Sequence, residues 1–378
     1  MIATYPVGGV LYDYGQYALG LERLGFDVYY LEDTGGSTYD PRTRLYGPDA
    51  SYGVQFLAAA LETLSPRLAG RWHFRDVEGR SYGLAQDEMN DIVARADLFL
   101  NVSGGTLLRD EYLPSRRKVL IDTDPGWNHF VNYPRWDESP GWKGTHGYRA
   151  HDHFFTYAEN IGGDGCLLPD LGLDWLPTRP PVVLDLWQPE PPGEVWTTVL
   201  TWKNFQQSIE HEGRSYGTKE LEFGKVESLP SLVRARLEMA IGGAESPVEH
   251  WRKLGWSITS SVERSITPAD YRHYIQSSRG EFSVAKNVYV DTLSGWFSCR
   301  SICYLAAGRP VVVQDTGFTR NIPAGKGLLA FSSLDEAASA IAAVEADYDA
   351  HQRAALAIAR RYFSAEHVLS DMLTRIAS

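Results

Sequence analysis

A short stretch near residue 300 combines residue types that bind anions. The turn at residues 295–298 precedes a predicted helix over residues 298–307, and Arg300 lies in the first turn of that helix. The backbone amides of a helix N-terminus, a hydroxyl group and a guanidinium together suit a diphosphate, helped by the helix dipole. In the alternative interpretation, Ser298 only caps the helix and Arg300 is exposed. The pattern predicts one of these two arrangements.

The segment that follows puts a carboxylate and flexible backbone at the end of a buried strand. The predicted helix stops at Gly308, and Pro310 opens an apolar strand over residues 310–314. Asp315, Thr316 and Gly317 then form a turn. Ligand crevices in open parallel sheets lie beyond the carboxyl ends of the strands, so this turn is a candidate binding loop.

Three further charged side chains could contact phosphate or sugar groups. Lys203 follows the first predicted strand of the second half of the chain, and Lys219 ends the segment 216–219. Either lysine could neutralise a phosphate, although an exposed, unpaired lysine is the default. Glu281 could accept hydrogen bonds from sugar or ribose hydroxyls, or could only pair with Arg279.

Alternating strands and helices must position these residues. Near the N-terminus, a few strand-like residues precede Gly8 and Gly9, an amphipathic helix ends at Gly25, and a strand follows over residues 27–32; this predicts one βαβ unit. Because few residues precede Gly8, the sequence is expected to begin close to, or slightly inside, the natural first strand. Farther on, we expect a helix over residues 88–96 and strands over residues 98–102, 118–121 and 153–157.

The second half repeats this alternation after a break. Six prolines between residues 177 and 194 leave little room for a regular helix and predict a linker. Strands are then expected over residues 195–200, 256–260, 282–285, 310–314 and 327–331, and helices over residues 229–241, 269–277, 298–307 and most of 334–378. A chain of 378 residues is therefore expected to form two α/β domains.

The composition excludes several classes of protein. With 48 acidic and 36 basic residues the net charge is −12, which argues against broad contact with nucleic acid or an anionic membrane. The sequence shows neither an apolar run long enough to span a bilayer nor a secretion signal, so we expect a cytoplasmic protein. Cys166, Cys299 and Cys303 lack metal-type spacing and are expected to be reduced thiols.

The motif A-x-G-x-P-V-V at residues 306–312, followed by D-x-G at 315–317, resembles the C-terminal domain of GT-B glycosyltransferases. Residues 8–9, 29–33, 122–126, 278–282 and 295–318 are similar to a bacterial "glycosyltransferase family 1"-type subgroup. The resemblance implies an α/β fold of GT-B architecture, with two Rossmann-like domains facing each other across a cleft. The acceptor-side domain would comprise residues 1–178, the linker 179–194, the nucleotide-sugar domain 195–355, and a helix crossing back to the first domain 356–378.

The same resemblance implies transfer of a sugar from a UDP- or TDP-linked donor to a small-molecule or glycan acceptor, without a metal or other cofactor. A homodimer is compatible with it. The donor would contact residues from both domains: Gly8, Gly9, Lys203, Lys219, Glu281, Phe297, Ser298, Arg300, Asp315, Thr316 and Gly317.

The sequence departs from the family pattern at one place. Many retaining GT-B enzymes carry two glutamates eight positions apart on the helix before A-x-G-x-P, where this chain has Gly295 and Cys303. Ribose recognition by those carboxylates is therefore not expected here, and the stereochemical outcome stays open. Asp122 and Asp124 have the spacing of a D-x-D metal motif but fall in the presumed acceptor domain.

Transfer from a nucleoside diphosphate sugar requires stabilisation of the leaving group and, in an inverting reaction, a base for the acceptor hydroxyl. Asp13, at the expected junction of the N-terminal loop and helix, is the first candidate base, although it could instead stabilise the helix start. Asp124, His129 and Glu159 are second choices because they follow strand ends of the same domain.

Two alternative functions remain open from the sequence. One is a sugar-nucleotide 2-epimerase-like reaction, which needs no acceptor. The other is a non-catalytic protein that binds a nucleotide sugar. A dinucleotide-dependent oxidoreductase is disfavoured because no G-x-G-x-x-G follows the first predicted strand.

Overall fold

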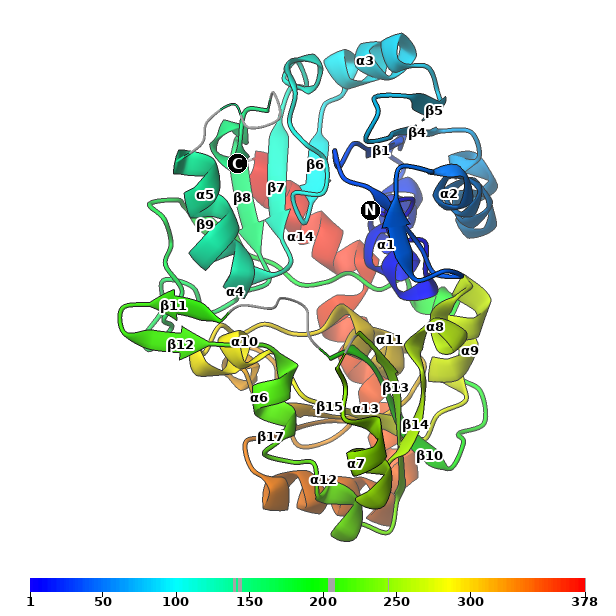
Figure 1. The fold of residues 1–378 in the computed structure, drawn as a ribbon, viewed down its shortest axis with the longest axis vertical. Coiled ribbons are helices and arrows are strands. Elements are labelled where there is room, and N and C mark those ends of the chain that lie inside the picture. The colour runs from blue at the N-terminus through cyan, green and yellow to red at the C-terminus, as the bar shows by residue number, and fades with distance from the viewer. Residues whose placement is uncertain (139–140, 142–144, 203–207, 244, 378) are drawn as a thin grey trace.

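The computed structural model describes residues 1–138, 141, 145–202, 208–243 and 245–377, which form two α/β domains (Figure 1). The C-terminal domain is built on a parallel sheet in the order β14-β13-β10-β15-β16-β17. Its strands are β10 (Val195–Thr201), β13 (Arg236–Gly242), β14 (Ser257–Ser260), β15 (Gly280–Ser283), β16 (Val311–Gln314) and β17 (Leu328–Phe331). In chain order this reads 3-2-1-4-5-6, the arrangement of a Rossmann sheet.

The central strands of this sheet are buried on both faces. Every residue of β15 and β16 is buried, and the sequence of β16 is Val-Val-Val-Gln. Such continuous apolar runs suit parallel strands that are covered by helices on both sides. The covering helices and the smaller elements are α6 (Lys219–Phe223), α7 (Val248–Lys253), α8 (Ser261–Ser265), α9 (Pro268–Gln276), α10 (Asn287–Asp291), α11 (Cys299–Ala306), α12 (Leu334–Ala346), α13 (Tyr348–Ile358) and the hairpin β11 (Ile209–His211)–β12 (Arg214–Tyr216).

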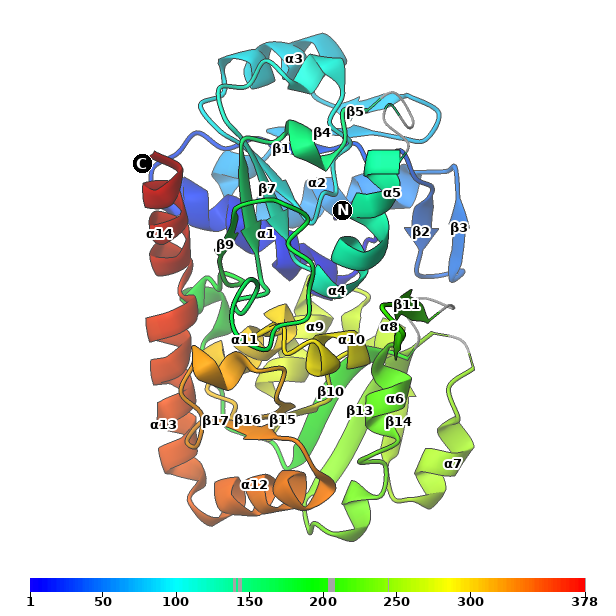
Figure 2. The same ribbon diagram turned by 90° about the vertical axis from the view of Figure 1, so that its left-hand side faces the viewer.

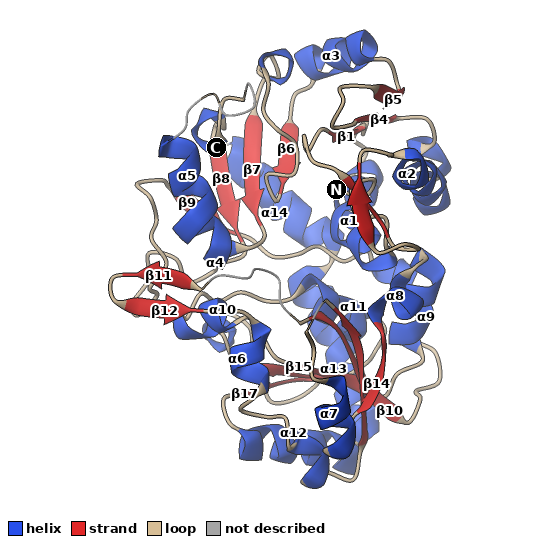
Figure 3. Ribbon diagram, in the orientation of Figure 1, coloured by secondary structure: helices blue, strands red, loops and turns tan. Residues whose placement is uncertain are grey.

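The N-terminal domain carries its strands in two separate groups (Figure 3). One group has the order β1-β4-β5, with β1 (Tyr30–Glu32) parallel to β4 (Trp72–Arg75) and β5 (Ser81–Gly83) antiparallel. The other group is fully parallel and consists of β6 (Phe99–Val102), β7 (Lys118–Asp122), β8 (His153–Thr156) and β9 (Trp175–Pro177). The helices of this domain are α1 (Gly8–Arg23), α2 (Ser51–Leu64), α3 (Gln86–Arg95), α4 (Pro125–Trp127) and α5 (Tyr133–Glu138), and β2 (Thr38–Asp40) and β3 (Leu45–Gly47) form a hairpin.

Two elements differ from the sequence prediction. Residues 229–241, predicted as a helix, contain the strand β13 and a short 3-10 turn. Leu237, Met239 and Ile241 alternate with neighbours on the other face, and over a span this short an alternating pattern is hard to tell from a helical one. The first residues of the chain form turns, not a strand, and helix α1 begins at Gly8.

The C-terminal helices join the two domains. Helices α12 and α13 lie along the C-terminal domain, and α14 (Ala365–Ala377) lies against α1 of the other domain (Figure 2). A Cβ atom at Gly20 would come within 2.6 Å of Leu369 Cδ1, so glycine permits this close approach of α1 and α14. Among the described helices, none is both long and apolar enough to cross a membrane.

Candidate functional site

Asp13 lies where α1 meets the C-terminal domain. It occupies the second turn of α1, inside the helix and not at its start as the sequence suggested, because the helix begins at Gly8. Burial raises the pKa of its carboxyl group to about 6, against the opposing effects of the Cys299 thiol and the Arg300 guanidinium. A carboxylate with this pKa is deprotonated near neutral pH and still basic enough to accept a proton.

Lys219 lies at the start of α6 in the C-terminal domain and is only partly exposed. Its ammonium group makes no hydrogen bond or ion pair within the described part of the chain. Desolvation, followed by repulsion from Arg300 and Lys286, lowers its pKa to about 7. An anion beside Lys219 would relieve this repulsion, so the position favours binding of a phosphate group.

Arg300 is close to both Asp13 and Lys219, but other groups occupy its guanidinium. It donates to Glu281 Oε1 at 2.5 Å, to Ser283 Oγ at 2.5 Å and to the Val199 carbonyl at 2.8 Å. Glu281 itself is fully buried, and its Oε2 has no hydrogen-bond partner among the described residues. Arg300 therefore acts on Asp13 and Lys219 through its positive charge. Its hydrogen bonds connect α11 to strands β10 and β15.

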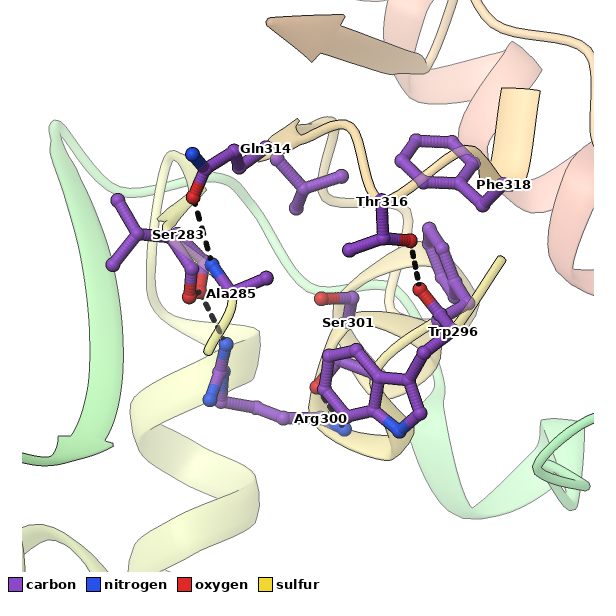
Figure 4. A pocket seen from close by; sticks show the side chains of 12 residues that line it. Ser283, Ala285, Trp296, Arg300, Ser301, Gln314, Thr316 and Phe318 are labelled. Carbon is purple, nitrogen blue, oxygen red and sulfur yellow. Dashed lines mark hydrogen bonds between the residues drawn. The ribbon is translucent and has the colours of Figure 1, made fainter. Parts of the chain in front are cut away.

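A small cavity of about 20 Å³ opens at the carboxyl ends of β15 and β16 and the N-terminus of α11 (Figure 4). Ser298 caps α11, because its hydroxyl accepts from the Arg300 amide at 3.2 Å. The Ser301 side chain lines the cavity, is 1% exposed, and has a hydroxyl without a partner in the described structure. An unpaired buried hydroxyl beside a helix N-terminus is a place where a ligand oxygen can bind.

Asp124 follows β7 and contacts the other domain. Its carboxylate accepts from the Tyr289 hydroxyl at 2.5 Å and forms an ion pair with Lys286. Both partners come from the segment around α10 in the C-terminal domain. In this arrangement Asp124 joins the two domains and its oxygens are occupied.

His129 and Glu159 are also held by neighbouring groups. His129 is fully buried, with Nε2 at 3.1 Å from Asp122 Oδ2 and Nδ1 at 2.8 Å from the Pro169 carbonyl. Glu159 forms a bidentate ion pair with Arg179, both contacts being 2.7 Å long. The polar groups of both residues are therefore occupied by protein partners.

The turn Asp315-Thr316-Gly317 uses its polar groups internally. Asp315 accepts from the Gly317 amide at 2.8 Å, and Thr316 donates to the Trp296 carbonyl at 2.6 Å. Asn160 of the N-terminal domain donates to the carbonyls of Leu293 and Gly317 at 2.9 and 3.0 Å. The turn thus holds the loop after α10 and joins the two domains.

Gly317 gives a testable consequence. Its φ is +87°, and an added Cβ would lie 2.7 Å from Asn160 Nδ2. We expect Gly317→Ala to lower the free energy of unfolding by about 2 kcal/mol or more, because backbone strain and a clash act together. Urea unfolding measures this. Gly172→Ala is the matched control, since Gly172 has a φ of +69° and no atom within 4 Å of the added Cβ. An equal loss in both variants would contradict a role for the Asn160 contact.

The remaining predicted donor residues fall in three groups. Gly8 and Gly9 lie in the first turn of α1 against α9, where a Cβ at Gly8 would come within 2.5 Å of the Thr267 carbonyl oxygen. Phe297 is buried and packs against Phe318 and Phe363. Lys203 lies outside the described residues.

Sequence reasoning missed Lys286 and Asn160, and identified Cys299 only as a thiol. The partners of Lys286 and Asn160 are more than 100 positions away in the chain, so their contacts cannot be read from the local sequence. The polar loop Glu159-Asn160 at the end of a strand was the available indication for Asn160.

Asp122 is the buried centre of a local network. It accepts hydrogen bonds from Asn128, His129, Tyr133 and Thr156.

Comparisons with known proteins agree with this architecture. Residues 225–378 match the protein family described as Glycosyl transferase-like. The fold is similar to that of a glycosyltransferase from Rickettsia africae, with 12% identity, a TM-score of 0.51, and coverage of 97% of this chain and 94% of that one. No curated protein sequence gives a match.

Two structures with bound ligands share the fold as well. Alr3699/HepE from Anabaena, solved in complex with UDP and glucose, is 11% identical with a TM-score of 0.52, and 93% of this chain aligns with 99% of that one. An alpha-glucosyltransferase in complex with UDP is 12% identical with a TM-score of 0.50, over 77% of this chain and 84% of that one. The chain therefore has the GT-B fold of two Rossmann-like domains, and its residues 225–378 match the Glycosyl transferase-like family.

Proposed function

We propose that this protein transfers a sugar from a UDP- or TDP-linked donor to an acceptor hydroxyl, with Asp13 as the base and without a metal ion. The observation that carries this proposal is the pair of perturbed groups at the domain interface. A partly buried lysine without a partner in the described structure and a desolvated carboxylate both lie near Cys299 and Arg300. Perturbed ionisable groups of opposite type, gathered at one place, are typical of an active site.

The chemistry assigns one role to each group. The acceptor oxygen forms a bond to the anomeric carbon of the donor, and the bond from that carbon to the diphosphate oxygen breaks. Asp13 takes the proton from the acceptor hydroxyl. Lys219 and the amides at the N-terminus of α11 stabilise the negative charge that develops on the departing diphosphate. The Ser301 hydroxyl donates a hydrogen bond to an oxygen of the nucleotide sugar.

Metal independence is part of the proposal and is supported by the state of the D-x-D carboxylates. Asp122 receives hydrogen bonds from four side chains, and Asp124 is paired with Lys286 and Tyr289. Among the described residues, no three His, Cys, Asp or Glu side chains gather as a metal site. A cationic side chain would then neutralise the diphosphate.

A screen of the purified protein against UDP-, TDP- and GDP-sugars tests the proposal. We expect one donor to raise the melting temperature and to be hydrolysed slowly, both to the same extent with and without EDTA. Isomerised donor without hydrolysis would indicate the epimerase-like reaction instead. Binding without turnover in the presence of varied acceptors would indicate a binding protein, and no stabilisation by any donor would contradict the nucleotide-sugar site.

The pH profile of kcat/KM should report both groups in the free protein. Activity is expected to rise as pH increases through about 6, because Asp13 must lose its proton to act as a base. It should fall as pH increases through about 7, because Lys219 then loses the charge that attracts the diphosphate. Lys219→Arg should remove the alkaline limb, since arginine stays protonated. A profile without either limb would contradict these assignments.

A further inference from the structure

The two sheets of this protein differ at one place. In the C-terminal sheet, β10 lies between β13 and β15 and pairs with both in parallel. In the N-terminal domain the equivalent neighbours are β1 and β6, and no described strand lies between them. Counted outward from this gap, β1 and β4 correspond to β13 and β14, and β6, β7 and β8 correspond to β15, β16 and β17. The two N-terminal groups of strands thus repeat the C-terminal order with the central position unfilled.

A groove of about 670 Å³ occupies this central position. Its walls come from β1 and β6, and α1 and α3 line it as well. Most of the lining is apolar, including Tyr17, Leu21, Leu31, Ile92, Val93 and Leu100. A residue in a packed sheet takes up about 160 Å³ at the usual strand rise, strand spacing and sheet spacing, so the groove holds about four residues of a strand. Protein interiors seldom contain a void of this size.

The strand edges that face the groove have the right pattern of backbone groups. The Tyr30 amide donates to the backbone carbonyl of Arg71, just before β4, and the Phe99 amide donates to the backbone carbonyl of Arg117, just before β7. Because a strand directs alternate amides to opposite edges, the amides of Leu31 and Leu100 point into the groove. A strand between β1 and β6 would pair with both edges.

Met1 lies at one end of the groove. Its nitrogen donates to the Tyr30 hydroxyl at 2.9 Å and lies 2.6 Å from Glu32, the last residue of β1. Its side chain would be 2.7 Å from a Cβ at Gly105, just after β6. A strand running parallel to β1 and β6 would end at this point and continue through residues 2–7 into α1. That path makes a strand–helix–strand unit with α1 and β1, which is the connection that joins parallel strands.

We infer that the groove between β1 and β6 holds a central β-strand, parallel to both, formed by apolar residues joined to the amino side of Met1 in the same polypeptide. A strand of this polypeptide fits better than a separate peptide, because Met1 lies at one end of the groove and residues 2–7 connect it directly to α1. This strand would complete the Rossmann sheet beneath Glu32, whose carboxylate accepts from the amides of Ala3 and Thr4.

The test uses the protein isolated from its own cells. Intact-mass spectrometry should show a chain extended beyond Met1 by at least a strand's length of residues. Hydrogen exchange should then be at least ten-fold slower at the Leu31 and Leu100 amides than in a recombinant chain of residues 1–378. The amides of Tyr30 and Phe99 are the matched controls, since they donate to Arg71 and Arg117 in both forms and should change far less.

Proline placed in the middle of the extension should restore fast exchange at Leu31 and Leu100. A central strand does not tolerate proline, so the strand would no longer present its carbonyls as acceptors for these two amides. A native chain that begins at Met1 would overturn the inference. So would an extension that leaves exchange at Leu31 and Leu100 unchanged, or a small apolar molecule found in the groove by native mass spectrometry of the cellular protein.

Discussion

Replacing Asp13 with asparagine should lower the rate of sugar transfer by about 10²- to 10⁴-fold, the usual contribution of a general base. The amide has nearly the same shape but cannot accept the acceptor proton. Donor binding should be kept, because Asp13 lies on α1 and Lys219 lies in the other domain. The measurement is kcat for transfer or donor hydrolysis, together with the donor Kd by calorimetry.

The same substitution should stabilise the protein above pH 6. Burial raises the folded-state pKa of Asp13 from 3.8 to about 6, so the folded state loses stability as pH rises through that range. The cost of the buried charge is roughly 3 kcal/mol, and asparagine removes it. We expect a higher melting temperature for Asp13→Asn than for the wild type at pH 8 and a much smaller difference at pH 4.

Asp91→Asn is the matched control for Asp13→Asn. Asp91 is an exposed aspartate on another helix of the same domain, so its replacement should change neither activity nor melting temperature. Full activity in Asp13→Asn would exclude Asp13 as the base. Loss of activity together with loss of donor binding and of stability would instead indicate a structural role.

Replacing Lys219 with alanine should weaken donor binding by about 10- to 100-fold, since hydrogen bonds to charged groups contribute about 1.5–3 kcal/mol each. Lys219 makes no ion pair within the described structure, so its removal leaves no described carboxylate without a partner. The folded protein should therefore remain as stable as the wild type or become slightly more stable. Calorimetric titration with UDP and with the matching UDP-sugar measures the effect.

Two variants separate charge from position at Lys219. Lys219→Arg keeps the charge and should retain most of the affinity. Lys253→Ala removes an exposed lysine at the end of α7 and should leave the Kd unchanged. If UDP bound Lys219→Ala as tightly as the wild type, the diphosphate site would have to lie elsewhere.

Much of the fold follows from local patterns in the sequence. The helix that stops at Gly308, the strand opened by Pro310 and the turn at Gly317 all occur where they were predicted. Glycine and proline act through their own backbone conformations, so their effects can be read without the rest of the chain. The prediction of a helix over residues 229–241 was wrong, since tertiary packing decides between helix and strand for a short apolar run.

The sequence by itself determined much of the α/β alternation, the resemblance to GT-B glycosyltransferases and the group of polar residues near the strand ends. Only the tertiary structure decided which of those side chains are occupied and which are available. Arg300, Asp124 and Asp315 are bound by protein groups, whereas Lys219 is left facing other cations. The physical reason is that hydrogen-bond partners and desolvation depend on residues far apart in the chain, which local sequence patterns do not specify.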